Sequence, residues 1–210
     1  MKQPSIVIVD YGVGNTCSVS NAISALGYRK LKISGAEADI LNADALILPG
    51  VGAFEGCAKR LRERHLDTLL HEAVQVRKKP ILGICVGMQL MATISEENGN
   101  FAGLDWISGK VVKLELPDNY AVPHVGWNDV AQRREDILFS RIAGSPNFYF
   151  DHSYHYQCDP TFVTADCDYG IRVTAAINKE NIHGVQFHPE KSQNNGLRLF
   201  RGFFNAVHSC

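Results

Sequence analysis

The fold is indicated most clearly by Gly83-Ile84-Cys85-Val86-Gly87, which follows the apolar run Pro80-Ile81-Leu82. The apolar run predicts a buried strand, and the two glycines predict a sharp turn from that strand into a helix. Glycine at both positions leaves room where a side chain would collide with the cramped backbone. A cysteine at the apex lies near a helix N-terminus, where partial positive charge favours the thiolate. The stretch therefore predicts a reactive thiol at the end of a buried strand.

A second segment, Gln186-Phe187-His188-Pro189-Glu190, ends another apolar strand. Side chains two residues apart share a face in an ideal strand, so we expect Glu190 to orient the imidazole of His188 while the ring faces Cys85. These three residues form a nucleophile, a base and an orienting acid, and the amide of Val86 would face an oxyanion at the thiol. Each segment alone also fits a buried structural cysteine or a surface histidine. Both segments, however, follow predicted buried strands, whose C-terminal ends are where sites form in α/β sheets.

Composition limits the classes of function. The chain has 210 residues, 45% of them hydrophobic, and a formal net charge of −1, so we expect one domain spanning residues 1–210. Such a charge gives no field that favours nucleic acid or an anionic membrane, and we expect neither as a partner. We interpret the basic groups around Arg60–Arg64 and at Arg77–Lys79 as solvated helix faces. No apolar run reaches the roughly 18 residues of a membrane span, and residues 1–9 lack the layout of a signal peptide.

Six cysteines, at positions 17, 57, 85, 158, 167 and 210, show no C-x-x-C spacing, and the eight histidines include no H-E-x-x-H. We therefore expect no metal site and no cofactor. Reduced thiols indicate a cytoplasmic protein. Gly12-Val13-Gly14 looks like the start of a dinucleotide fingerprint, but Cys17 stands where the third glycine belongs, which argues against a nucleotide site.

In the first half, short apolar strands alternate with helical patterns. Strands are predicted at 6–9, 28–33, 45–48 and 81–84, and helices over 19–26, over 61–74 and after Cys85. The alternation predicts an α/β fold with a doubly wound, mostly parallel sheet flanked by helices. Strands predicted at 111–115, 148–150, 153–157, 161–165 and 171–177 indicate an antiparallel addition in the second half. Residues 182–187 return to the core, and a last helix is expected to bury Leu197, Phe200, Phe204 and Val207.

Taken together, Gly83–Gln89 and His188-Pro189-Glu190 resemble the class I (triad) glutamine amidotransferases. Within that class, four further segments resemble the glutaminase subunits of imidazole glycerol phosphate synthase, an enzyme of histidine biosynthesis. These segments are Asp10-Tyr11-Gly12-Val13-Gly14-Asn15, Pro49-Gly50-Val51-Gly52-Ala53-Phe54, Pro123-His124-Val125-Gly126-Trp127-Asn128 and His152-Ser153-Tyr154. The resemblance covers essentially the whole chain.

The resemblance implies that Cys85 attacks the side-chain amide of glutamine, that His188 removes the thiol proton and then protonates the departing ammonia, and that Glu190 holds His188. Water then hydrolyses the glutamyl thioester. The oxyanion hole would combine the amide of Val86 with an amide of the loop formed by Gly50, Val51 and Gly52. A glycine-rich loop flips a peptide plane at little cost, so we expect a chain that is nearly idle alone and active in complex.

By motif position, the resemblance also assigns glutamine recognition to Gln89, Glu97, His152, Ser153 and Tyr154. As an alternative to substrate binding, Gln89 could be an exposed helix residue. Glu97 is not distinguished by sequence from its polar neighbours Glu96 and Asn98. The implied partner is a cyclase subunit with a (β/α)₈ barrel, which forms a heterodimer, receives the ammonia and makes imidazole glycerol phosphate and AICAR. A turn-like segment carrying Trp127 and Asn128, together with Lys191, is expected to face it, although a lone Trp also fits core filler.

Departures from the commonest pattern leave alternatives open. Val86 stands where leucine is usual, Asp151 stands where an apolar residue is usual, and residues 104–109 differ from the usual segment. A paralogous subunit that supplies ammonia to a sugar-nucleotide amidating enzyme of surface polysaccharide synthesis is one alternative. A second alternative is a catalytically silent, partner-stabilising subunit, against which the intact Cys85, His188 and Glu190 argue. A cysteine hydrolase or chaperone with an elbow cysteine is a third, and the placement of His188 and Glu190 fits it poorly.

Overall fold

The strand that carries Cys85 lies in the middle of an eight-stranded sheet with the order β2-β1-β3-β4-β14-β13-β12-β9. The computed structural model describes residues 3–208, with the backbone alone for residues 206 and 208. Five neighbouring strands are parallel: β2 (Leu31–Ser34), β1 (Ile6–Val9), β3 (Ala45–Gly50), β4 (Ile81–Cys85) and β14 (Ile182–Val185). Three antiparallel strands follow: β13 (Arg172–Lys179), β12 (Val163–Asp168) and β9 (Ala131–Gln132). The prediction of a mostly parallel sheet with an antiparallel addition is confirmed.

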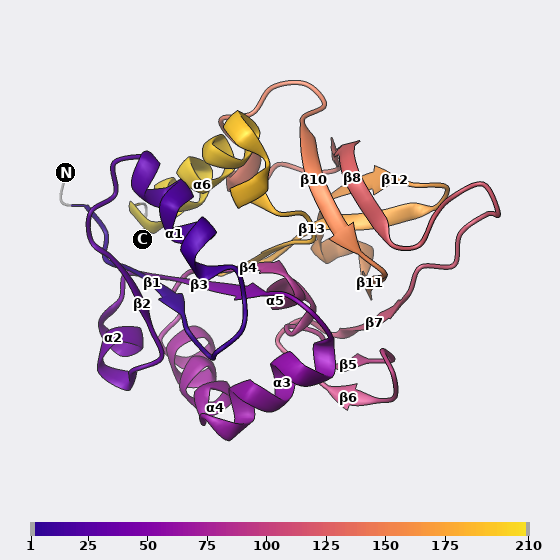
Figure 1. The fold of residues 1–210 in the computed structure, drawn as a ribbon. Helices are drawn as coiled ribbons and strands as arrows, with labels where there is room; N and C mark the ends of the chain where they lie inside the picture. Colours follow the sequence, from indigo (N-terminus) through magenta and orange to yellow (C-terminus); the bar gives the residue numbers. More distant parts are fainter. Residues whose placement is uncertain (1–2, 209–210) are drawn as a thin grey trace.

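Helices cover both faces of the parallel part (Figure 1). One face carries α1 (Thr16–Ala25) and α6 (Gln193–His208), and the other carries α2 (Glu37–Asn42), α3 (Phe54–Glu63) and α4 (Leu66–His71). The last helix buries Leu199, Phe200, Phe203 and Phe204, whereas the predicted Leu197 and Val207 are only half-buried. The apolar face of α6 is therefore rotated from the predicted one. Helix α2 has no counterpart among the elements predicted from sequence.

Two predicted helices are shorter than expected. The amphipathic pattern over 61–74 breaks at His65, which adopts a left-handed backbone with φ 55°, and continues as α4 and a π-helical turn, η1 (Glu72–Val76). The helix after Cys85, α5 (Val86–Gln89), has four residues. Beyond it, Leu104 N donates to Leu90 O at 2.7 Å and Trp106 N to Met91 O at 3.0 Å. These carbonyls are taken by another segment, so the helix does not continue.

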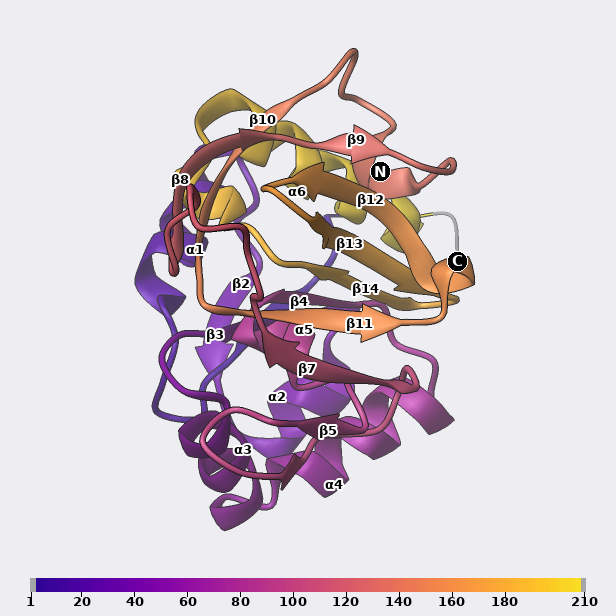
Figure 2. The same cartoon turned by 90° about the vertical axis from the view of Figure 1, so that its right-hand side faces the viewer.

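Two smaller sheets lie beside the main one (Figure 2). One is a ribbon of β8 (His124–Asp129) and β10 (Asn147–His152). The other has the order β11-β7-β5-β6 and consists of β11 (Tyr154–Cys158), β7 (Gly109–Lys113), β5 (Ile94–Ser95) and β6 (Phe101–Ala102). Part of the predicted antiparallel addition therefore forms separate sheets. The segment of Trp127 and Asn128, predicted as turn-like, is strand β8.

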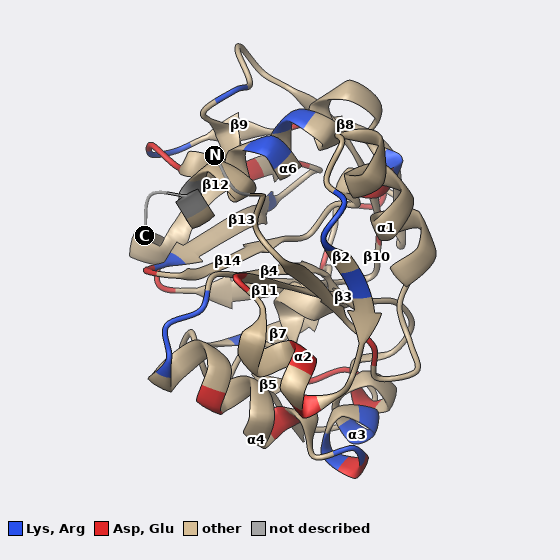
Figure 3. Cartoon of the chain, turned by 90° about the vertical axis from the view of Figure 1, so that its left-hand side faces the viewer, with Lys and Arg blue, Asp and Glu red and all other residues tan. Residues whose placement is uncertain are grey.

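Charged side chains are spread over the surface. Figure 3 marks basic and acidic residues interleaved along the ribbon of α3, as expected of a solvated helix face. Within residues 3–208, none of the helices combines the length and the apolar character needed to cross a bilayer.

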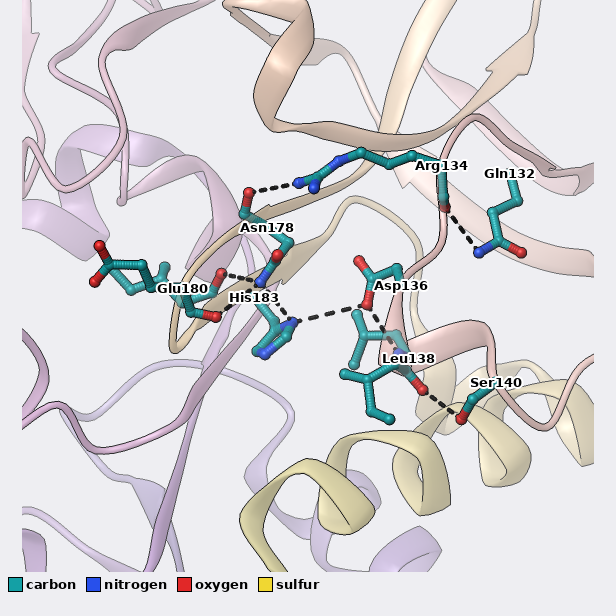
Figure 4. A network of polar contacts seen from close by, with 10 residues as sticks. Gln132, Arg134, Asp136, Leu138, Ser140, Asn178, Glu180 and His183 are labelled. Atoms are coloured by element: carbon teal, nitrogen blue, oxygen red, sulfur yellow. Dashed lines mark hydrogen bonds and ion pairs between the residues drawn. The ribbon is translucent and has the colours of Figure 1, made fainter. Parts of the chain in front are cut away.

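A buried polar network joins β13 and β14 to the 3₁₀ turn η2 (Ile137–Phe139), away from Cys85 (Figure 4). Asn178 Nδ2 donates to Glu180 O at 3.0 Å and to Ile182 O at 3.2 Å, and it also lies 3.1 Å from His183 Nδ1. Asp136 Oδ1 accepts from Leu138 N at 2.9 Å and lies 3.9 Å from His183 Nδ1.

Candidate functional site

The turn at Cys85 has a strained backbone. Cys85 ends β4 with φ 55° and ψ −115°, a region that costs a non-glycine residue about 1–3 kcal/mol. The chain then enters α5, where a Cβ on Gly87 would lie 1.8 Å from Leu48 O, and one on Gly83 would lie 2.7 Å from Gly87 O. Strand β3 ends beside this turn, with Gly50 in register with Cys85. The glycines therefore allow two chain segments to meet closely beside the thiol.

His188 and Glu190 meet just after β14, the strand that pairs with β4 on the other side. His188 Nδ1 lies 2.9 Å from Glu190 Oε1, and both side chains are at most 3% exposed. We expected an extended segment here, but residues Pro189–Lys191 form a 3₁₀ turn, η4, which turns the carboxylate back to the ring. Because Nδ1 donates to the carboxylate, the other ring nitrogen, Nε2, is available to Cys85.

The charge state of His188 follows from its neighbours. Burial lowers its pKa, but hydrogen bonds to Cys85 and Glu190, and the negative charge of those groups when ionised, raise the pKa to about 10. The imidazole therefore holds a proton at neutral pH. A proton on a ring between a thiol and a carboxylate is available to a leaving group bound at Cys85.

Cys85 and His188 open into a pocket of about 280 Å³. Its lining brings together most of the residues that the sequence analysis selected: Val51, Gly52, Cys85, Val86, Gln89, Glu97, His152, Ser153, Tyr154, His188 and Lys191. Pro123 and Asp151 complete it. Glu190 lies behind His188, while Gly50 adjoins Cys85 through the sheet. Trp127 and Asn128 lie outside the lining, on β8.

Comparison with known proteins agrees with this geometry. Residues 7–207 match the family model described as glutamine amidotransferase class-I. This chain belongs to the class I glutamine amidotransferases. It is 47% identical over 202 residues to imidazole glycerol phosphate synthase subunit HisH 2 of Vibrio vulnificus, covering 96% of this chain and 94% of that protein. It is 43% identical over 203 residues to HisH 2 of Pseudomonas aeruginosa, covering 96% of this chain and 100% of that protein.

Solved structures show the same fold at lower identity. A putative GMP synthase subunit from Thermoplasma acidophilum aligns with a TM-score of 0.75 and 20% identity, covering 100% of this chain and 96% of that one. PurLQS from Thermotoga maritima aligns with a TM-score of 0.75 and 17% identity, covering 98% of this chain and 100% of that one. The predicted family and fold are confirmed.

The amidotransferase fixes the loop beside Cys85 at three points. Tyr11 Oη donates to Pro49 O at 2.7 Å, and Cys57 Sγ contacts Val51 O at 3.5 Å. At the far end, Phe54 N donates to Glu97 Oε2 at 2.8 Å. Between these points Gly52 has φ +88°, which favours glycine. The freedom of the loop is therefore confined to a few peptides next to the thiol.

Gln89 and Glu97 are placed differently from their simplest sequence interpretations. Gln89 is 3% exposed, and its Nε2 donates to Tyr154 O and to Gln186 Oε1, both at 3.0 Å. It is therefore a buried polar residue and not an exposed helix position. One oxygen of Glu97 is held by Phe54 N, and the side chain lines the pocket.

Two polar residues beside the pair of His188 and Glu190 were given no role from sequence. Gln186 is fully buried, and its Nε2 lies 3.8 Å from Cys85 Sγ. Ser192 Oγ donates to His188 O at 2.6 Å and accepts from Tyr149 N at 3.0 Å. Gln186 precedes His188 by two positions, so strand alternation offered a signal for it. The contacts of Ser192 depend on the turn η4 and on β10, which no local pattern reveals.

The predicted partner-facing residues differ in exposure. Trp127 is 46% exposed on the outer face of β8, and Lys191 Nζ lies 5.2 Å from the centre of the Tyr149 ring. Lys191 also lies 3.7 Å from Asp151 Oδ2, a half-exposed ion pair of small energetic weight. Asn128 is half-buried on the opposite face of the strand and donates to Asp168 O at 2.9 Å.

Proposed function

We propose that this chain hydrolyses glutamine through Cys85, His188 and Glu190 and passes the ammonia to a partner enzyme. The single observation that carries the proposal is the pair of His188 and Glu190 beside a thiol on a strained turn. The distance of 2.9 Å between His188 Nδ1 and Glu190 Oε1 supports a base oriented by a buried acid. The positive φ of Cys85 supports a nucleophile that projects from the end of its strand.

In the proposed reaction, Cys85 has given its thiol proton to His188, and the sulfur attacks the side-chain amide carbon of glutamine to form a tetrahedral oxyanion. The carbon–nitrogen bond then breaks, and the nitrogen takes a proton from His188 and leaves as ammonia. Water attacks the resulting thioester while His188 accepts its proton, and glutamate leaves as the carbon–sulfur bond breaks. Glu190 keeps the ring in one tautomer throughout.

The oxyanion is stabilised in this proposal by the amide of Val86 and by an amide of the loop formed by Gly50, Val51 and Gly52. Removing one such donor typically costs about 10²–10³ in rate. The three contacts that hold this loop support a switch confined to a few peptides. We propose that docking of the partner completes the hole, so that the chain alone is nearly idle.

Glutamine binding is assigned to the pocket residues Gln89, Glu97, His152, Ser153 and Tyr154. The free oxygen of Glu97 suits the substrate ammonium, because its other oxygen is already fixed by a backbone amide. Backbone amides of the 152–154 segment suit the substrate carboxylate. No cofactor enters this chemistry.

For the acceptor, we propose the cyclase subunit of imidazole glycerol phosphate synthase, a (β/α)₈ barrel, docked in a heterodimer against Trp127, Asn128 and Lys191. The identity of 43–47% to HisH subunits over nearly the whole chain supports this choice. Ammonia is largely protonated and unreactive in neutral water, so delivery through an enclosed path preserves it. A free thiol nucleophile needs a reducing compartment, which supports a cytoplasmic location.

The test is glutamate release by the pure chain, alone and with an equimolar histidine-pathway cyclase subunit plus its nucleotide substrate. We expect a large rise in rate on addition of the cyclase, absent in the Cys85→Ala variant. A fast rate without the partner would refute the proposed gating. If no rise occurs while a glutamine-mimicking electrophile still labels Cys85, the acceptor is a different enzyme, such as one that amidates sugar nucleotides.

A further inference from the structure

The ribbon of β8 and β10 has two faces with different surroundings. Along β8, Val125 and Trp127 are 51% and 46% exposed, whereas His124, on the other face, is 2% exposed. In register with His124 on β10 is His152, which is 6% exposed and lines the pocket. The ribbon thus carries a solvent-facing surface on one side and part of the pocket wall on the other.

The two histidines are joined by a hydrogen bond whose direction is fixed. His152 Nδ1 lies 2.8 Å from Tyr154 O, a carbonyl that only accepts, so Nδ1 carries the proton. His152 Nε2 is then an acceptor, and His124 Nδ1, 3.0 Å away, donates to it. This leaves His124 Nε2 to accept from Asn128 Nδ2 at 3.4 Å. Each link donates toward the pocket.

The surroundings keep both histidines neutral and hold the His124 ring in place. Burial lowers the pKa of His124 to about 4 and that of His152 to about 3, so neither ring gains a second proton at neutral pH. The His124 ring is stacked between Phe150, with centroids 4.6 Å apart, and Tyr169, with centroids 3.8 Å apart. A stacked ring cannot turn freely, so a shift of β8 moves the ring as a unit.

At the pocket end, the series of polar contacts continues to the thiol of Cys85. Tyr154 O also accepts from Gln89 Nε2, which donates in addition to Gln186 Oε1. Gln186 Nε2 in turn faces Cys85 Sγ at 3.8 Å. Polar contacts therefore run without a gap from Asn128, half-buried on the inner face of β8, to the sulfur of Cys85.

We propose that His124 is a positioning residue, which transmits docking on β8 to the pocket wall at His152 and from there to Cys85. This inference rests on the proposed function, because it takes the outer face of β8 as the docking surface of the acceptor enzyme. His124 is buried and is not itself one of the pocket-lining residues, so its effect on the reaction passes through His152.

A second route from the ribbon to the site does not use His124. Tyr149 O, on β10, accepts from His188 N at 2.8 Å, and Ser192 bridges Tyr149 N and His188 O. Docking on β8 could reach His188 through this backbone alone. The experiment therefore has to remove the histidine contact and leave the β10 backbone intact.

The test compares the wild type with His124→Phe, which keeps the ring stack and removes both ring hydrogen bonds. With the histidine-pathway cyclase subunit plus its nucleotide substrate, we expect unchanged affinity for the cyclase and a fall in the stimulated kcat of about tenfold or more. The rate without the cyclase should stay within about twofold. His124→Asn, whose side-chain amide can still donate toward His152, should recover part of the stimulation.

Tyr169→Phe is the matched control, because it keeps the stacked ring beside His124 and removes only a hydroxyl that donates to Ala121 O at 3.1 Å. We expect it to behave as the wild type. Full stimulation in His124→Phe would overturn the proposal and assign the coupling to the β10 backbone. An equal loss with and without the cyclase would overturn it as well, since that marks a purely structural role.

A measurement on the chain alone separates this inference from the proposed acceptor. Imidazole ¹⁵N spectra should show His124 and His152 as Nδ1–H tautomers, and Asn128→Ala should shift the resonances of both rings. If the His152 resonances do not move, transmission through His124 is refuted whatever the partner. If they move while the cyclase subunit fails to stimulate the wild type, the relay stands and the proposed acceptor is wrong.

Discussion

Two buried histidines, His183 on β14 and His188 just beyond it, each lie beside an almost fully buried carboxylate, yet their pKa values shift in opposite directions. Burial lowers the pKa of His183, against the charge of Asp136, whereas the pKa of His188 rises to about 10. Cys85 as well as Glu190 raises the pKa of His188, and the two rings also differ at Nδ1. His188 Nδ1 faces an accepting oxygen of Glu190 at 2.9 Å, but His183 Nδ1 faces the donating amide of Asn178 at 3.1 Å, and Asp136 stands off at 3.9 Å (Figure 4).

A nearby carboxylate does not by itself make a histidine basic. The amide of Asn178 cannot reverse, because its NH₂ group is held by two backbone carbonyls. A proton on His183 Nδ1 would therefore face another donor. His188 has two acidic neighbours and no such obstacle, so the ring just beyond β14 holds a proton while the ring within β14 stays neutral.

The largest expected effect comes from replacing each histidine in turn. His188→Asn removes the group that moves protons, and we expect the partner-stimulated kcat for glutamate release to fall by at least about 10⁴-fold. His183→Asn should leave kcat within about threefold while lowering stability by about 1–3 kcal/mol, since it removes a buried hydrogen-bonding group. Urea unfolding of both variants provides the control. A comparable loss of kcat in both variants would contradict the contrast.

Exchanging the two carboxylates for amides tests their separate roles. In Glu190→Gln, the new amide can donate to His188 Nδ1, which favours the wrong tautomer, so we expect kcat to fall by about 10²–10⁴-fold. Asp136→Asn should leave kcat unchanged, because Asp136 lies outside the pocket lining. Steady-state glutaminase assays with the cyclase subunit measure both. A Glu190→Gln enzyme with wild-type kcat would remove Glu190 from the mechanism.

The two histidines should also give opposite dependences of stability on pH. A histidine with a lowered folded pKa costs stability as the pH falls below about 6.5, because the unfolded chain then binds the extra proton. His188, with its raised pKa, contributes stability below about 6.5 that is lost as the pH rises toward 10. Each change has a slope of at most about 1.4 kcal/mol per pH unit.

Urea unfolding between pH 4.5 and 9.5 measures these slopes (the range is about two to three pH units on either side of the unfolded pKa). His183→Gln should flatten the acid side only, and His188→Gln the alkaline side only. Identical curves for the two variants would show that neither histidine carries the predicted linkage.

The smallest expected effect comes from giving His183 Nδ1 an accepting oxygen, like the one that faces His188 Nδ1. Asn178→Asp removes the hydrogen bonds to Glu180 O and Ile182 O but puts an accepting, charged oxygen where His183 Nδ1 now meets a donor, so we expect the midpoint of His183 titration to rise by about one pH unit or more. NMR titration of the imidazole resonances measures it. An unchanged midpoint would mean that burial alone, and not the amide, keeps His183 neutral.

Much of the central sheet could be predicted because strands such as β3 and β4 are buried on both faces and appear as continuous apolar runs. The turn at Cys85 could also be predicted from the sequence, since close packing against Leu48 leaves room only for glycine at position 87. Strand β8 was not, because its alternation of buried and exposed residues includes a glycine and three polar side chains. The break in the helix at His65 could not be predicted, because its left-handed backbone occurs at a residue that is not glycine.

The parts of the site that sequence did not reveal depend on distant contacts. Glu97 meets Phe54 N across the fold, and Gln186 acquires its place beside Cys85 only because β14 and β4 are paired. Glu190 was assigned correctly to the neighbourhood of His188, but by the wrong local geometry, since a 3₁₀ turn and not an extended strand brings the two together.

The two-sided alternation of β8 has a consequence for how such a protein can change over generations. If the acceptor enzyme docks on the outer face of β8 as proposed, substitutions at Val125 and Trp127 change which enzyme attaches, while His124, behind them, keeps its contacts. A lineage could thus acquire a new acceptor enzyme and leave its glutamine chemistry untouched. Insertion of a single residue into β8 ahead of His124 would shift its pairing with His152 and move every side chain of the strand to the other face. The length of this segment is therefore under tighter constraint than the identity of its exposed residues.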